Sequence, residues 1–209
     1  MKYLVGLMIL IVLITCACEK PTNEEVFYEM QKSFNNLENY SCIADIMIKG
    51  NKSSKYYKAI HKFKAPNKYS IKYISAGESE GNMIIYNGEV ALLKHPLIGK
   101  ESIIKDYDVK KNENLFVGYF LKNFITTEDS SFESEIIKDK EYLLLTTSIP
   151  GNNKYRVKEK LWIDKETFKP YRMVILDKDN NITTEILYTN FNDRVHFNEN
   201  YFNIKTNLN

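Results

Sequence analysis

Apolar and polar side chains alternate with a period of two along most of the chain after residue 40, which is the spacing of half-buried β-strands. Short groups of Pro, Gly, Asn and Asp separate the alternating runs and favour turns. Between the fourth and fifth runs, Asn87-Gly88 favours a type I′ hairpin turn. The pattern predicts one antiparallel meander of about nine to eleven strands. The predicted strands cover residues 41–49, 55–65, a stretch beginning at 69, 83–86, 89–93, 132–138, 142–148, 155–164, 171–177 and 183–191, with a final short strand near 202–205.

Two segments have helical spacing instead. Thr22 and Glu25 form the pattern of a capping box, and apolar residues then recur every three or four positions, which predicts an amphipathic helix over residues 23–37. Residues 112–124 are rich in aromatic side chains at helical spacing and predict a second helix. Residues 95–111 have no clear period.

The first eighteen residues differ from the rest of the chain. After Lys2, residues 4–14 form an apolar run interrupted only by a glycine, which is too short to cross about 30 Å of hydrocarbon. The run is typical of a secretory signal peptide. It ends in Thr-Cys-Ala-Cys and resembles a bacterial lipobox, in which the signal is cut directly before a cysteine that receives diacylglycerol.

Cys18 is the better candidate for lipidation, because the small Ala17 precedes it, whereas Cys16 follows a branched threonine. We therefore predict a signal peptide over residues 1–17, a lipidated anchor and short tether over 18–22, and one domain over 23–209. Two or more acyl chains would hold the protein on the extracytoplasmic face of a bacterial membrane. A signal anchor without lipid and a simple cleaved signal are the alternatives.

The remaining cysteine, Cys42, lies on a predicted strand and is expected to be a small core residue with a free thiol. An intermolecular disulfide is the alternative for this residue.

Charge and composition exclude several classes of protein. The 29 Lys and Arg residues nearly balance 27 Asp and Glu, which argues against a nucleic-acid partner. No nucleophile, metal or phosphate-binding motif occurs, so we expect no catalytic residue, no metal ligand and no cofactor. The histidines are far apart and are expected to be surface or strand residues: His61, His95 and His196.

The carboxylates of the chain also have structural explanations. Glu133 and Glu135 alternate along a strand, and Asp177 and Asp179 lie in a predicted turn, which favours solvated surface. Asp164 ends a strand and can cap the following turn through its side chain. Aromatic residues make up 13% of the chain, and two interpretations stay open: core packing, or an aromatic binding face.

Several segments, in their order along the chain, resemble the LolA/LolB/RseB-like superfamily of lipoprotein carriers. The most specific is Leu161-Trp162-Ile163-Asp164 followed by a Thr and Pro170, and the resemblance covers most of residues 23–206. It implies an α+β, mainly β fold: an unclosed, curved antiparallel β-barrel with two lid helices over a hydrophobic concavity. The other segments are Phe63–Ile71, Tyr86–Glu89, Thr189–Asn192 and Asn200–Phe202.

The sequence departs from the soluble carriers at one position. The carriers have an arginine directly before a proline that corresponds to Pro66, whereas this chain has Ala65. With its predicted anchor at Cys18, the chain most resembles the clostridial GerS-type germination lipoproteins. That resemblance implies a non-enzymatic membrane lipoprotein of the spore intermembrane space. It would bind and activate a cortex N-acetylmuramoyl-L-alanine amidase in the step that leads to muramic-δ-lactam.

Two other functions remain as alternatives. The concavity could bind lipid or a lipoprotein, as in a carrier. A peptide-binding stress sensor of the RseB branch is disfavoured, because that branch has a second domain. Open sheet edges would also allow a strand-exchanged homodimer. The sequence does not assign residues to a protein partner.

Overall fold

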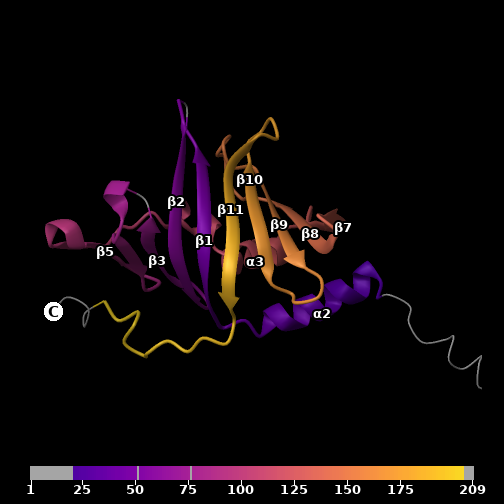
Figure 1. The fold of residues 1–209 in the computed structure, drawn as a ribbon, viewed down its shortest axis with the longest axis horizontal. Helices are drawn as coiled ribbons and strands as arrows, with labels where there is room; N and C mark the ends of the chain where they lie inside the picture. Colours follow the sequence, from indigo (N-terminus) through magenta and orange to yellow (C-terminus); the bar gives the residue numbers. More distant parts are fainter. Residues whose placement is uncertain (1–20, 51, 76, 205–209) are drawn as a thin grey trace, which may run out of the picture.

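The computed structural model describes residues 21–50, 52–75 and 77–204, and they contain a single antiparallel sheet of eleven strands (Figure 1). The strand order is β6-β5-β4-β3-β2-β1-β11-β10-β9-β8-β7, so the first strand pairs with the last and β6 and β7 form opposite edges. The sheet is therefore unclosed, as predicted. Its strands are β1 (Asn39–Lys49), β2 (Ser54–Lys64), β3 (Lys68–Ser75), β4 (Met83–Tyr86), β5 (Ala91–His95), β6 (Lys100–Ile104), β7 (Ser131–Ile137), β8 (Lys140–Ser148), β9 (Lys158–Asp164), β10 (Pro170–Leu176) and β11 (Ile182–Asn192).

The period-two pattern determines which side chains enter the core. In β1 the alternate residues Tyr40, Cys42, Ala44 and Ile46 are all buried on one face. Cys42 is a free thiol and is buried in the core, as the sequence predicts. A shift of one residue would turn every one of these side chains to the other face, so burial fixes the register.

Two α-helices close the concave face of the sheet and one of its ends. Helix α2 (Asn23–Asn35) runs along the lower end of the sheet, and α3 (Val117–Thr126) lies behind it (Figure 1). The predicted capping box is present: the Thr22 amide donates to the Glu25 carboxylate at 2.8 Å, and the Glu25 amide donates to the Thr22 hydroxyl at 3.2 Å. The predicted fold class, with its curved unclosed sheet and two helices, is confirmed.

Three local predictions are wrong. Asn87-Gly88 does not form a type I′ turn: only Gly88 of the pair has a positive φ, of 100°, and the loop has four residues. The Asn87 side-chain oxygen accepts from the amides of Glu89 and Val90, which stabilises this wider turn. The helix predicted from residue 112 begins only at Val117, because short 3₁₀ turns precede it.

The third error concerns the C-terminal segment. Residues 202–204 form no strand, although a short one was predicted there. Instead Phe202 and Ile204 are buried with Ile85 and Leu92. The segment follows β11 and runs toward β5 (Figure 1), where it covers the convex face of β4 and β5. A separate cluster around Trp162 lies on the convex face of β8–β10.

The packing of α3 on the sheet requires a glycine at one point. A Cβ atom on Gly118 would lie 2.4 Å from the ring of Phe63, which is itself buried. A real Cβ needs more room than this, so the helix approaches β2 more closely than any larger residue permits.

We predict that Gly118→Ala destabilises the protein, although alanine favours helix formation. The clash with Phe63 is expected to lower the free energy of unfolding by about 1–3 kcal/mol in urea unfolding. The double variant Gly118→Ala/Phe63→Leu should show positive coupling, because the smaller side chain relieves the clash. Strictly additive effects would contradict the proposed contact.

Candidate functional site

The concave side has a closely packed half beneath α3. Phe116, which directly precedes α3, is fully buried, with its ring centroid 4.7 Å from that of His61 and 4.6 Å from that of Tyr69. The Tyr188 hydroxyl donates to the Leu115 carbonyl at 2.9 Å. The Tyr119 hydroxyl donates to the Asn67 carbonyl, in the turn between β2 and β3. Aromatic packing and these hydrogen bonds hold the segment that leads into α3 against the sheet.

His61 lies inside this packed half. Its side chain is fully buried on β2, and neither ring nitrogen has a hydrogen-bond partner. Burial lowers the pKa of His61 to about 3, so the imidazole is neutral at physiological pH. Within the described ranges, no three or more His, Cys, Asp or Glu residues group together as a metal site.

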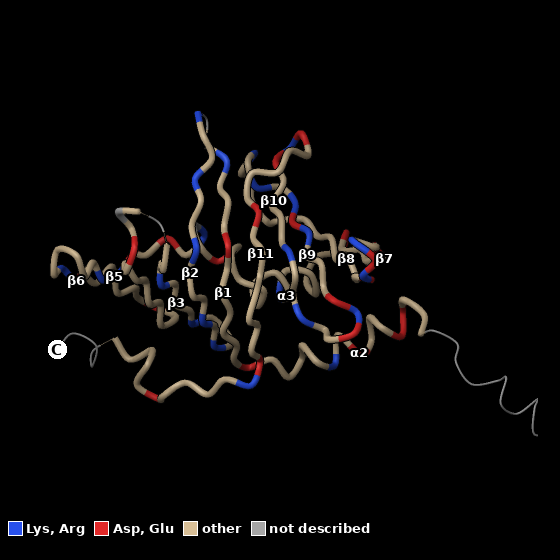
Figure 2. Tube along the Cα trace, viewed as in Figure 1, with Lys and Arg blue, Asp and Glu red and all other residues tan. Residues whose placement is uncertain are grey.

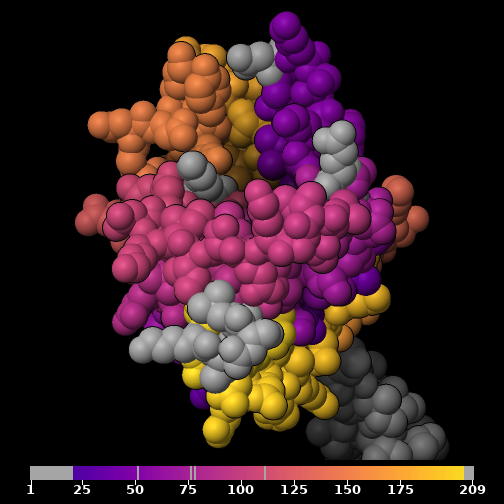
Figure 3. Space-filling view, turned by 90° about the vertical axis from the view of Figure 1, so that its left-hand side faces the viewer, coloured from indigo at the N-terminus to yellow at the C-terminus, as the bar shows by residue number. Residues whose placement is uncertain are grey.

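The other half of the concave side is open. Figure 3 shows a hollow at the upper end of the sheet, between indigo atoms of the β1–β2 region and orange atoms of the later strands. A cleft of about 340 Å³ lies between α3 and the segment that joins β8 to β9. Charged and amide side chains dominate its lining, including Lys110, Glu113, Lys122, Asn123, Arg156 and Glu159.

Glu159, on β9, is a buried carboxyl group in the lining of this cleft. It is only 3% exposed, and the Asn123 side-chain amide donates to it at 2.8 Å and to the Ser148 carbonyl at 2.7 Å. Burial raises the pKa of Glu159 to about 7, against the opposing effect of the Asn123 hydrogen bond. The carboxyl group therefore changes between hydrogen-bond donor and acceptor near neutral pH.

The charges around Glu159 are mixed. Burial also raises the pKa of Glu113, while Lys110, Lys122 and Arg156 supply positive charge. Arg156 donates to the Lys110 carbonyl at 2.6 Å, which ties the 3₁₀ segment to the β8–β9 connection. Such a lining suits a polar peptide-like ligand that both donates and accepts hydrogen bonds. The described residues of the lining include no cysteine, serine or histidine that could act as a nucleophile–base pair.

The sequence did not reveal this cleft, because its parts come together only in three dimensions. One signal was available in the sequence. Glu159, Leu161 and Ile163 are alternate residues of one strand, so their side chains lie on the same, inward face of the sheet. A charged residue at an inward position needs partners, and Asn123 supplies one from α3.

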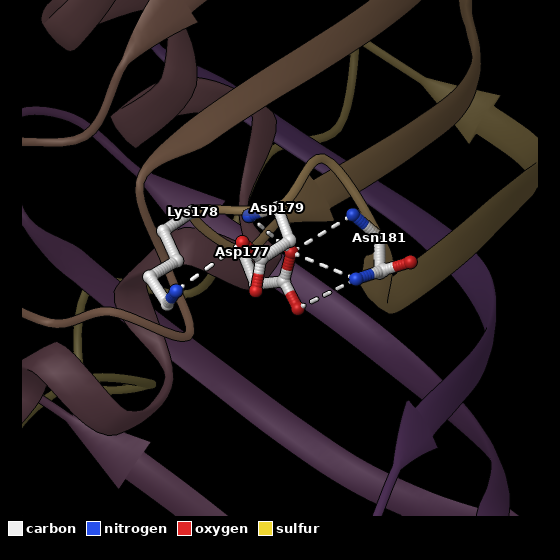
Figure 4. Close-up of polar contacts among 4 residues, drawn as sticks. All are labelled: Asp177, Lys178, Asp179 and Asn181. Carbon is white, nitrogen blue, oxygen red and sulfur yellow. Dashed lines mark hydrogen bonds and ion pairs between the residues drawn. The ribbon is translucent and has the colours of Figure 1, made fainter.

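The aspartates that were assigned to turns have structural roles. Asp177 accepts from the amides of Asp179 and Asn181 at 2.9 and 2.8 Å, and Lys178 pairs with Asp179 (Figure 4). These backbone hydrogen bonds, the one from Asn181 above all, lower the pKa of Asp177 and order the β10–β11 hairpin.

Asp164 caps the β9–β10 turn, as predicted. Its carboxylate accepts from the amides of Glu166 and Thr167 and pairs with Lys140. Burial acts to raise the pKa of Asp164, but these hydrogen bonds outweigh it and leave the pKa lowered. The two carboxylates on β7 differ in their surroundings. Glu133 is exposed, while Glu135 accepts a hydrogen bond from the Trp162 indole at 2.7 Å.

The predicted lipidation residue Cys18 and its alternative Cys16 lie outside the described residues, so their prediction remains untested by the fold. Neither helix within residues 21–204 is long and apolar enough to cross a membrane.

Comparison with known proteins identifies relatives over most of the chain. A family described as "Sporulation protein YdcC-like" matches residues 1–202. The GerS lipoprotein of Clostridioides difficile, solved in complex with the CwlD amidase, is 31% identical, with 87% of this chain and 99% of that chain covered and a TM-score of 0.49. No curated protein matches this chain.

Two further structures have similar architecture at low identity. An uncharacterized conserved protein from Thermus thermophilus is 13% identical, with 88% and 93% of the chains covered and a TM-score of 0.54, which supports the fold alone. A putative outer membrane lipoprotein-sorting protein domain from Vibrio parahaemolyticus is 12% identical, with 88% and 99% covered and a TM-score of 0.49.

We predict that the buried carboxyl group of Glu159 makes stability fall as the pH rises. The unfolded chain loses this proton near the ordinary pKa of 4.5, whereas the folded chain retains it until about pH 7. The free energy of unfolding should therefore decrease between these values. Glu159→Gln removes the titration and should be more stable than the wild type at pH 8, by on the order of 1–3 kcal/mol, but not at pH 4.

Urea unfolding of both proteins across this pH range measures the difference. His61 titrates in the opposite sense below pH 6.5 but is common to both proteins, so it cancels. Glu133→Gln, on an exposed side chain, is the matched control and should follow the wild type. A pH-independent difference for Glu159→Gln would refute the assignment.

Proposed function

This chain belongs to the YdcC-like family of sporulation proteins, and we propose that it is a membrane-anchored, non-catalytic lipoprotein that binds and activates a cortex N-acetylmuramoyl-L-alanine amidase during spore germination. One observation carries the proposal: the 31% identity to GerS extends over 87% of this chain, and GerS was solved in complex with an amidase. The amidase product leads to muramic-δ-lactam in the cortex.

The architecture supports a binding role for the surface of the protein. Phe116 and its neighbours fill the concavity under α3, which argues against the alternative of a lipid or lipoprotein carrier that uses this space. The hollow beside Glu159 stays accessible, and we assign it to a polar segment of the amidase. A ligand that binds one state of an enzyme preferentially raises the population of that state, so docking alone can activate it.

The proposed location follows from the N-terminal sequence. Cys18 would carry the lipid, residues 18–22 would form the tether, and α2 would begin the domain at Asn23. This arrangement places the amidase partner on the extracytoplasmic face of the membrane, in the intermembrane space of the spore.

Complex formation tests the proposed function. The domain from Glu19 onward, mixed with an amidase from the same organism, should co-elute in size-exclusion chromatography and increase cleavage of cortex peptidoglycan. Lys122→Glu, at the exposed rim of the cleft, should weaken the complex by about tenfold, consistent with loss of one interfacial charge pair. Lys169→Glu reverses an exposed charge in the β9–β10 turn, outside the cleft, and is the matched control.

These two measurements test the proposed function and the proposed docking site separately. Failure of the wild-type domain to bind or activate the amidase would overturn the proposed function. A normal complex with Lys122→Glu would leave the function intact and overturn the assignment of the cleft.

Lipidation predicts a second, independent result. Cys18→Ala should abolish palmitate labelling in the native host and move the protein out of the membrane fraction, because acyl chains supply the membrane affinity. Cys16→Ala should leave both unchanged. Loss of labelling in the Cys16 variant alone would transfer the anchor to that residue.

A further inference from the structure

An exposed apolar tip marks the end of the molecule that is remote from α2. The 3₁₀ turn η2 (Pro96–Ile98) joins β5 to β6, and its Leu97 and Ile98 are 73% and 65% exposed. Gly99 closes the turn in the left-handed conformation, with a φ of 60°. Single exposed aliphatic residues are ordinary, but two adjacent ones at a protruding turn indicate a contact surface.

A basic hollow of about 590 Å³ adjoins the tip. Lys72, Lys94, His95 and Lys100 line it, together with a single carboxylate, Glu101. The Lys94 ammonium lies 2.9 Å from the Glu101 carboxylate, so that negative charge is already compensated within the pair. Lys72 lies on β3, Lys94 on β5 and Lys100 on β6, and Figure 2 shows the basic positions of this end of the sheet in blue. The hollow therefore carries a net positive charge directly beside the apolar turn.

We propose that this end of the domain is a membrane-contact surface, in which Leu97 and Ile98 enter the boundary between headgroups and acyl chains while Lys72 and Lys100 bind lipid phosphates of an anionic bilayer. The apolar turn and the basic hollow match the two contributions to peripheral membrane binding, which are insertion of apolar side chains and attraction to anionic lipids.

The size of the tip favours a bilayer over a protein partner. A stable protein interface buries about 800 Å² on each side and needs a complementary surface. A turn of three residues cannot supply that area, whereas a bilayer accepts a small protrusion without shape complementarity. The charge also fits, because each lysine near an anionic surface strengthens binding by roughly fivefold.

The position of the tip would determine how the domain is oriented on the membrane. The chain enters α2 at one end of the long axis, and β5 lies near the other end (Figure 1). A lipid at Cys18, which belongs to the proposed function, together with the tip would hold the domain lengthwise along the membrane. The tip contact itself does not depend on the lipid.

Vesicle sedimentation tests the proposal without the lipid anchor. The eleven strands and two α-helices of the described residues all lie after residue 22, so the domain from Glu19 onward contains all of them. This domain should bind phosphatidylcholine vesicles that contain ~30% phosphatidylglycerol, and added salt should weaken the binding because it screens charge.

Matched variants distinguish the two parts of the surface. Leu97→Ser/Ile98→Ser should weaken binding at least ~10-fold, because it removes the inserted aliphatic groups. Lys72→Glu/Lys100→Glu should abolish the preference for anionic over pure phosphatidylcholine vesicles. The control Ile125→Ser/Ile136→Ser alters side chains that are 63% and 68% exposed elsewhere and should bind as the wild type does.

Three results would overturn the proposal: no binding to anionic vesicles, equal binding by the tip and control variants, or loss of the amidase complex in the tip variant with vesicle binding retained. Amidase binding measured without vesicles should be unchanged in the tip variant. The vesicle assay can thus refute the membrane contact while amidase binding is retained. Equally, amidase binding can be absent while the membrane contact is retained.

Discussion

The pairing of β1 with β11 is the constraint on which the rest of the structure depends. It joins the strands β1–β6 to the strands β7–β11, and Ile46 faces Ile186 across the join. Without this long-range pairing the protein would have two separate, shallow sheets. With it, the segment between β6 and β7 must cross the concave face, and α3 becomes the centre of the core.

The position of α3 determines what the concave side can do. One half of the face is filled by Phe116, Phe120 and the side chains around them. The other half ends in the polar cleft around Glu159, which Asn123 on the same helix supports. The concave side is therefore packed under α3 and has a polar recess at the N-terminal end of β9.

Alternation in the sequence was sufficient to predict most of the sheet, because burial of one face imposes a strict period. It did not predict β6, since that strand lies at an edge and most of its residues are exposed. The helix start at Val117 and the turn at Asn87 were missed because 3₁₀ turns and side-chain hydrogen bonds outweighed the local preferences. The cleft could not be predicted, because its donor and acceptor come from α3 and β9.

Helix α2 also has a mechanical consequence. Any force that reaches the described domain from its N-terminal side enters through this helix before it reaches the sheet. Phe27 stacks on Phe132 at 4.2 Å, and the Lys165 ammonium donates to the Asn23 side chain at 2.8 Å. These contacts connect the helix to β7 and to the β9–β10 turn, so a pull would be shared across one side of the sheet. The N-terminal helix is thus fixed to the sheet at two points and cannot swing freely as a hinge.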